Sequence, residues 1–191
     1  MSWFDDDKKL LTKHEQKNRD IITAQVRKIK EVGIPKQNTQ IRIISETQIN
    51  SFSAIEYFLL KNATIDELYL AVYRINKDTV NLLCERIESK SIKYAEILVC
   101  SFFKNVSENW FVYLGQRLSN LKNCKFASCN THAKVSVWKK DNQYYVFEGS
   151  GNMSDNARIE QYLFEENKKV YEFHKKWISD IINCDGAVTN A

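Results

Sequence analysis

The sequence predicts an α/β fold in which a mixed, largely parallel sheet is flanked by helices. From residue 40 onward, short apolar segments typical of strands alternate with amphipathic segments typical of helices. This alternation is characteristic of parallel strands joined by helices. The last third departs from it, because two strand-like segments are separated only by a polar turn, which indicates an antiparallel hairpin. With 191 residues and only 1 Pro, the chain suits one sizeable domain without long linkers.

The first element that we expect is a charged helix over residues 6–33. Ile22, Val26 and Ile29 follow helical spacing, and Gly33 is typical of a residue that closes a helix. This apolar stripe is narrow and buries little surface. We therefore expect the helix to lean on the main domain or on a second subunit.

We expect an N-terminal helical extension over residues 1–39 and the main domain over residues 40–191. Apolar or alternating segments predict strands at 41–45, 66–75, 93–103, 124–129, 132–138, 144–150 and 160–165. Amphipathic segments predict helices at 51–63, 77–91, 107–121 and 167–184. Ser51 or Ser53 is the expected N-cap of the first of these helices and Ser107 that of the third, because a serine hydroxyl accepts a hydrogen bond from a free N–H group.

Composition and charge argue against several classes of protein. No apolar run approaches the ~20 residues of a membrane-spanning helix, and the N-terminus lacks the apolar core of a secretory signal. We therefore expect a cytoplasmic protein without a membrane partner. The five cysteines are odd in number and lack zinc-knuckle spacing, which favours free thiols, no metal site and no cofactor. The net charge of +4 is too mild to indicate nucleic-acid binding by itself.

The candidate functional residues lie around the expected hairpin. Alternation along residues 131–137 places His132 and Lys134 on one face of a strand and their apolar neighbours on the other. Gly-Ser-Gly-Asn ends the next strand, so Ser150 and Asn152 offer a hydroxyl and an amide beside glycines that allow close backbone approach. These four side chains suit an anionic tetrahedral group such as phosphate. The alternative is an ordinary solvated strand face.

The order His-Ala-Lys, hairpin, Gly-Ser-Gly-Asn resembles the signature of the phospholipase D superfamily, which reads His-x-Lys, Asp and Gly-Ser-x-Asn, and the resemblance covers residues 40–183. Glu160 follows where many members carry an acidic residue that orients the histidine. One position departs from the pattern: Lys139 occupies the place of the family's Asp, and Asp141, two residues further on, is either a turn residue or a displaced motif Asp. A second His-x-Lys begins at His174 without a Gly-Ser-x-Asn after it, and we interpret it as a surface pair.

The resemblance implies a metal-independent phosphodiesterase that acts through a covalent phosphohistidine. His132 would be the nucleophile, or the acid and base in a partner subunit. Lys134 and Asn152 would stabilise charge on the phosphate oxygens, and Ser150 would add a hydrogen bond. Glu160 would hold the imidazole N–H. Two histidines are needed and one motif supplies one, so the resemblance implies a homodimer with a shared site.

Three functions remain open. Short family members with a single motif are mostly homodimeric nucleases, which favours an endonuclease that cleaves DNA or RNA. A phospholipase or phosphatidyl transferase acting on lipid is the first alternative, and a non-catalytic nucleic-acid-binding or regulatory module on the same fold is the second. The Lys and Arg side chains of the expected N-terminal helix either contact nucleic-acid phosphates or form a solvated face.

Overall fold

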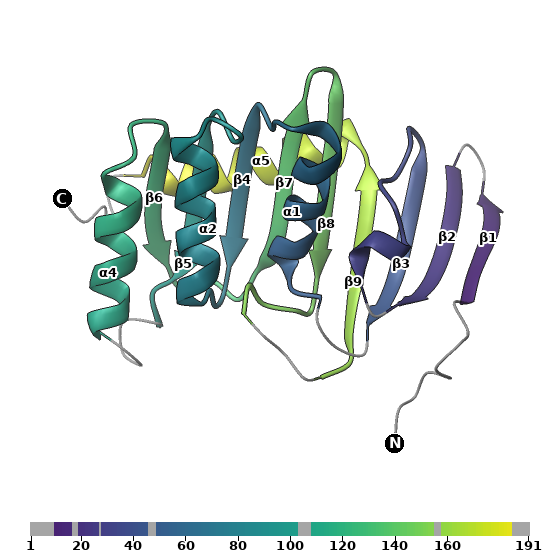
Figure 1. The fold of residues 1–191 in the computed structure, drawn as a ribbon, viewed down its shortest axis with the longest axis horizontal. Coiled ribbons are helices and arrows are strands. Elements are labelled where there is room, and N and C mark those ends of the chain that lie inside the picture. The colour runs from purple at the N-terminus through teal and green to yellow at the C-terminus, as the bar shows by residue number, and fades with distance from the viewer. Residues whose placement is uncertain are drawn as a thin grey trace.

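The structure, a computed structural model, describes residues 10–16, 19–26, 28–45, 49–102, 108–154 and 158–184. Within them, one sheet has the strand order β1-β2-β3-β9-β8-β7-β4-β5-β6 (Figure 1). The strands are β1 (Leu10–Gln16), β2 (Arg19–Val26), β3 (Thr39–Ser45), β4 (Glu67–Val72), β5 (Ala95–Cys100), β6 (Cys124–Cys129), β7 (Lys134–Lys140), β8 (Gln143–Gly149) and β9 (Glu160–Glu166). The helices are η1 (Ile29–Glu31), a short 3-10 helix, and α1 (Ser51–Asn62), α2 (Lys77–Glu88), α4 (Glu108–Ser119) and α5 (Lys168–Ile182). No helix of the described residues is long and apolar enough to span a bilayer.

The sheet is mixed, because parallel and antiparallel pairs are both present. β2 pairs in parallel with β3, and β5 pairs in parallel with both β4 and β6. The other pairs among the described strands are antiparallel. An α/β fold with a mixed sheet flanked by helices is confirmed, whereas the expectation of a largely parallel sheet is wrong. The reason is that the β7–β8 hairpin and β9 insert between β3 and β4 (Figure 1).

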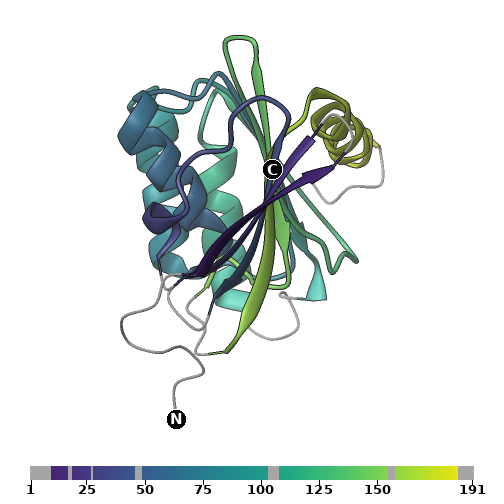
Figure 2. The ribbon, with the colours of Figure 1, turned by 90° about the vertical axis from the view of Figure 1, so that its right-hand side faces the viewer.

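Helices cover both faces of the sheet unequally (Figure 2). α1, α2 and α4 pack over the larger apolar core, where Phe58 of α1 meets Trp138 of β7 edge to face, with ring centroids 5.6 Å apart. Of the described helices, α5 alone lies on the opposite face, where Tyr171 and Ile178 are fully buried. Removing these large apolar side chains from water is the main stabilisation of the layers.

The N-terminal segment differs from the sequence prediction. β1 and β2 are strands, not parts of the charged helix expected over residues 6–33. β2 pairs with β3, with Ile22 opposite Ile41, and β1 pairs with β2. Ile21, Ile22 and Thr23 are consecutive β-branched residues, which favour strands. In addition, the edge of β3 offers backbone N–H and C=O groups, and a further strand forms hydrogen bonds with them. The strand preference of these residues and the pairing with β3 together outweigh the narrow apolar stripe with helical spacing.

The start of α1 also differs from the prediction. Its N-cap is Asn50, whose Oδ1 accepts hydrogen bonds from the backbone N–H of Phe52 at 2.9 Å and of Ser53 at 3.0 Å. Ser51 Oγ instead donates to the backbone carbonyl of Gly151 at 2.8 Å. The start of α1 is thereby joined to the Gly-Ser-Gly-Asn segment. Ser107, the expected cap of the third helix, lies outside the described residues.

The β7–β8 hairpin turns at Asp141. This residue has a positive φ of 52°, as tight hairpin turns require, and its N–H donates to Oδ2 of Asp66 at 2.7 Å. The turn lies at the opposite end of β7 from Lys134. Asp141 is therefore a residue of the hairpin turn.

Candidate functional site

Several strands end or begin at one edge of the sheet. β7 begins at Lys134, whose register partner Val72 ends β4. β8 ends at Gly149 beside β9, and Glu160 at the start of β9 pairs with Ser45 at the end of β3. This is the lower edge in Figure 1, away from the hairpin turn. The fold gathers there the five predicted site residues, His132, Lys134, Ser150, Asn152 and Glu160.

His132 and Lys134 contact each other directly. Lys134 Nζ lies 3.2 Å from Nδ1 of His132 and donates to the backbone carbonyl of that residue at 3.1 Å. Both side chains pack against Tyr73, which follows β4. The ring centroids of His132 and Tyr73 are 4.4 Å apart, and the ammonium of Lys134 is 5.3 Å from the centroid of the Tyr73 ring. An ammonium only donates, so Nδ1 is the acceptor and a neutral imidazole carries its proton on Nε2.

The pKa of Lys134 is shifted by burial and by nearby acidic groups. Burial lowers the pKa of its ammonium, and the carboxylate of Glu160 acts in the opposite direction. The net shift is downward. One partly buried cation, one carboxylate and an exposed imidazole therefore lie within electrostatic reach of one another at this edge.

Ser150 and Glu160 form a second contact. Ser150 Oγ donates to Oε2 of Glu160 and accepts a hydrogen bond from the backbone N–H of Gln161 at 3.0 Å. These bonds tie the Gly-Ser-Gly-Asn loop to the start of β9. The predicted contact between Glu160 and the imidazole stays a prediction.

Residues 149–153 lie between the N-termini of α1 and α2. Ser51 of α1 bonds to Gly151, and the N–H of Asn76, the N-cap of α2, donates to the carbonyl of residue 153 at 3.0 Å. A Cβ atom at Gly151 would lie 1.9 Å from Oη of Tyr162. Only glycine fits at this position, which is why the loop approaches the sheet so closely.

Asn152 holds a polar atom that the described residues do not satisfy. Its Oδ1 is buried and has no hydrogen-bond partner among them. An unsatisfied buried amide oxygen costs about 1–3 kcal/mol. Because Oδ1 accepts hydrogen bonds, a donor would satisfy it and a phosphate oxygen would not; any contact of Asn152 with phosphate must come from its NH2 group. Within the described ranges, no three His, Cys, Asp or Glu side chains are arranged to hold a metal ion.

A groove of about 810 Å³ opens beside the His132–Lys134 pair. We call it the α5 groove, because that helix forms one wall. Its lining includes Arg42 and Ile44 of β3, Glu148 of β8, Leu163 of β9, and His174 and Trp177 of α5. Sequence reasoning missed it, although alternation places Glu148, Arg42 and Leu163 on one face of the sheet and an i, i+3 spacing joins His174 to Trp177.

The interpretation of the second His-x-Lys as a surface pair is confirmed for Lys176, whose side chain is 77% exposed, and is wrong for His174. The His174 side chain is only 12% exposed, and its Nε2 lies 3.4 Å from Oε2 of Glu148. Its Nδ1 accepts a hydrogen bond from Nε1 of Trp177 at 3.0 Å. His174 also lowers the pKa of Glu148, which keeps that carboxylate ionised. The contacts with Glu148 of β8 and Trp177 hold this histidine against the sheet, and helical spacing alone does not reveal that.

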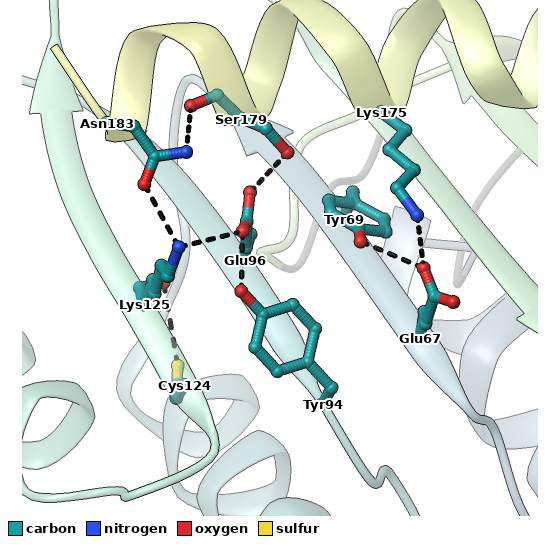
Figure 3. A network of polar contacts seen from close by, with 9 residues as sticks. All are labelled: Glu67, Tyr69, Tyr94, Glu96, Cys124, Lys125, Lys175, Ser179 and Asn183. Atoms are coloured by element: carbon teal, nitrogen blue, oxygen red, sulfur yellow. Dashed lines mark hydrogen bonds and ion pairs between the residues drawn. The ribbon is translucent and has the colours of Figure 1, made fainter.

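Two carboxylates on the sheet hold α5 in place (Figure 3). Glu67 accepts hydrogen bonds from Lys175 of α5 at 2.5 Å and from Tyr69 at 2.9 Å. Burial would raise the pKa of Glu67, but the hydrogen bonds outweigh it and lower the pKa to about 2. Further along the helix, the buried Glu96 accepts a hydrogen bond from Ser179 at 2.5 Å. The wall of the α5 groove is thereby fixed on the sheet.

The comparisons with known proteins concern the fold. No family model matches the sequence, and no curated protein matches it. Among solved structures, polyphosphate kinase from Porphyromonas gingivalis matches with a TM-score of 0.54 at 13% sequence identity. The match covers 72% of this chain and 25% of the kinase chain, so this chain spans about a quarter of that protein. At this identity the likeness shows the fold alone: the fold of this chain resembles a part of that polyphosphate kinase.

Proposed function

We propose that the protein is a metal-independent phosphodiesterase, an endonuclease that cleaves DNA or RNA through a phosphohistidine on His132. One observation carries the proposal: His132 and Lys134 lie 3.2 Å apart, between Nδ1 and Nζ, in the lining of a groove and at the same sheet edge as the Gly-Ser-Gly-Asn loop. The motif order of residues 132–160, which resembles that of the phospholipase D superfamily, supports it, and so does the α/β fold that this resemblance implies.

In the proposed reaction a ring nitrogen of His132 attacks phosphorus and displaces the leaving oxygen, which takes a proton from a second histidine. That histidine then removes a proton from water, which attacks the phosphohistidine and releases the phosphate product and His132. Attack through Nε2 requires the ring proton to move to Nδ1. Lys134 must therefore leave Nδ1, and a phosphate oxygen, as a charged acceptor, attracts the ammonium more strongly.

The other residues have supporting roles in this reaction. Lys134 and the Asn152 amide stabilise the charge that develops on the non-bridging oxygens. Once Lys134 has moved away, Nδ1–H of His132 donates a hydrogen bond to the carboxylate of Glu160. Ser150 holds the loop through its bond to Glu160, and it donates its hydroxyl proton to the phosphate only when that bond to Glu160 breaks.

The second histidine is assigned to another copy of the chain. His174 lines the same groove, but both of its ring nitrogens are engaged, with Trp177 and with Glu148. We therefore propose a two-fold homodimer in which two copies of His132 face one phosphate.

The test is a cleavage assay in excess EDTA with single-stranded DNA, duplex DNA and RNA. We expect wild-type cleavage that the chelator leaves unchanged, no turnover by His132→Ala, and a decrease in kcat/KM of about 100- to 1,000-fold for Lys134→Ala. Lys169→Ala, an exposed lysine on α5, is the matched control and should retain full activity. Normal cleavage by His132→Ala would refute the assignment. Phosphatidylcholine and polyphosphate belong in the same assay, the latter because of the fold likeness to polyphosphate kinase.

A further inference from the structure

The α5 groove is continuous with the candidate phosphate site. His132 and Lys134 are among its lining residues, together with their neighbours Ala133 and Val135, and the remaining lining comes from β3, β8, β9 and α5. Its volume of about 810 Å³ falls within the roughly 300–1,000 Å³ of pockets that enclose small ligands. A phosphodiester held at Lys134 would therefore extend one of its two flanking groups into this groove.

The side chains of the groove suit an unpaired nucleotide. Trp177 offers an indole ring, and aromatic rings stack with any unpaired base. Arg42 is exposed on β3 and offers a guanidinium, which pairs with phosphate oxygens in a fork geometry. Glu148 adds a carboxylate that is 37% exposed. The groove thus offers one partner for each part of a nucleotide. The aromatic ring suits the face of the base, the cation suits the phosphate, and the hydrogen-bond acceptor suits the polar edge of the base.

A lipid chain suits the groove less well. Ile44 and Leu163 are apolar, but they lie among Arg42, Glu148 and His174. A hydrocarbon chain would remove these polar groups from water without replacing their hydrogen bonds, which is costly. The chemistry of the groove therefore favours a nucleotide over an acyl chain.

We propose, resting on the phosphodiesterase function above, that the α5 groove binds the unpaired nucleotide next to the scissile phosphate, with its base against Trp177 and its outer phosphate at Arg42. Glu148 reads the base: a carboxylate only accepts hydrogen bonds, so it favours a base with an amino group, such as cytosine, over thymine. His174 is a positioning residue, because its contacts hold Glu148 and Trp177 in the groove.

The experiment measures binding of fluorescent oligo(dC), oligo(dT) and duplex DNA to the full chain by anisotropy, in a His132→Ala background that prevents cleavage. We expect oligo(dC) to bind more tightly than oligo(dT) and duplex. Trp177→Ala should weaken oligo(dC) binding about tenfold, as expected for the loss of one stacked base, and Trp177→Phe should restore most of it. Arg42→Ala should weaken binding of both oligonucleotides, whereas Glu148→Gln should abolish the preference for oligo(dC).

Two matched controls separate the groove from the general surface. Phe173 lies on the same helix as Trp177, outside the groove and 65% exposed, and Lys122 is an exposed cation outside it. Phe173→Ala and Lys122→Ala should bind as the parent chain does. Equal binding by Trp177→Ala, Arg42→Ala and these controls would overturn the proposal, as would a failure of the parent chain to bind either oligonucleotide.

The two proposals fail in different ways. Loss of oligonucleotide binding in the groove variants, with no phosphodiester cleaved by the wild type, would refute the enzymatic function and leave the groove as a nucleotide site. Cleavage by the wild type with normal binding by every groove variant would refute the groove and leave the enzyme. If the protein binds phosphatidylcholine vesicles and this binding depends on Trp177, the proposal of a nucleotide site would be overturned in favour of a lipid site.

Discussion

Gly151 sets how closely the Gly-Ser-Gly-Asn loop approaches β9. Tyr162 occupies the space that a side chain at this position would need, and its hydroxyl is held by donating to the carbonyl of Ile49 at 2.6 Å. The ring therefore has little freedom to give way. Asn152 follows immediately, so the position of its amide depends on this packing.

Gly151→Ala should destabilise the protein by about 1–3 kcal/mol, the usual cost of overpacking, and should lower activity by displacing Asn152. Thermal unfolding measures the first effect and the cleavage assay the second. Tyr162→Phe in the same chain removes Oη, the nearest clashing atom, and should recover part of the lost stability. Unchanged melting and activity of Gly151→Ala would show that the loop is not constrained as described.

At the residue scale, sequence patterns predict some of the residues that lie near the site and miss others. Alternation and motif order bring His132, Lys134, Ser150, Asn152 and Glu160 together, because strand ends at one edge follow from the order of strands. Tyr73 and His174 were not predictable as neighbours of this edge. Their positions depend on how a loop after β4 and a helix far along the chain pack on the sheet.

At the scale of elements, α5 depends on charged side chains as well as on apolar packing. Glu67 of β4 accepts hydrogen bonds from Lys175, Tyr69 and Tyr171, and Glu96 of β5 accepts from Ser179 and Tyr94. Partly buried carboxylates are tolerated because each is paired and hydrogen-bonded. The attachment of α5 to the sheet therefore depends on Glu67 being ionised.

Glu67→Gln should lower the free energy of unfolding at pH 7 by roughly 2 kcal/mol. The pKa of Glu67 in the folded state, about 2, is below its ordinary value of 4.5. Its stabilisation is therefore complete above pH 4.5 and is lost as the pH falls towards 2. Urea unfolding at several pH values should show the difference between wild type and variant shrinking across that window. Glu172→Gln, an exposed glutamate on the same helix, should show no such convergence.

The pattern of the N-terminal segment shows where element prediction fails. Helical spacing of three apolar residues suggests a helix, but β1 and β2 add to the sheet beside β3. A local pattern does not include the free edge of a sheet formed by residues later in the chain. The hairpin, in contrast, was predictable, because its alternation and its polar turn are both local.

At the scale of the whole molecule, one chain is expected to supply half of an active site. The fold presents a His132–Lys134 pair at its site edge. In the proposed mechanism another copy of the chain supplies the second catalytic histidine, since both ring nitrogens of His174 are engaged. A shared site makes activity depend on both subunits of a dimer.

Mixing tests this dependence. If wild type and His132→Ala are mixed in equal amounts and allowed to exchange subunits, only dimers with two wild-type chains should be active. The mixture should then retain about one quarter of the activity of the same total amount of wild type, since random pairing leaves about that fraction intact. Retention of half of the activity, with subunit exchange demonstrated, would indicate a site complete within one chain.

In the proposed reaction His132 becomes covalently bound to phosphorus, and trapping this intermediate is a direct test. The protein is mixed with substrate carrying a radioactive phosphate at the cleavage site, quenched in base during turnover, and digested for mass spectrometry. We predict an acid-labile phosphoryl adduct on His132 that is absent from His132→Ala. Active wild-type protein that cleaves the substrate, with no adduct trapped and with inversion of configuration at phosphorus, would contradict the account, because inversion indicates direct attack by water.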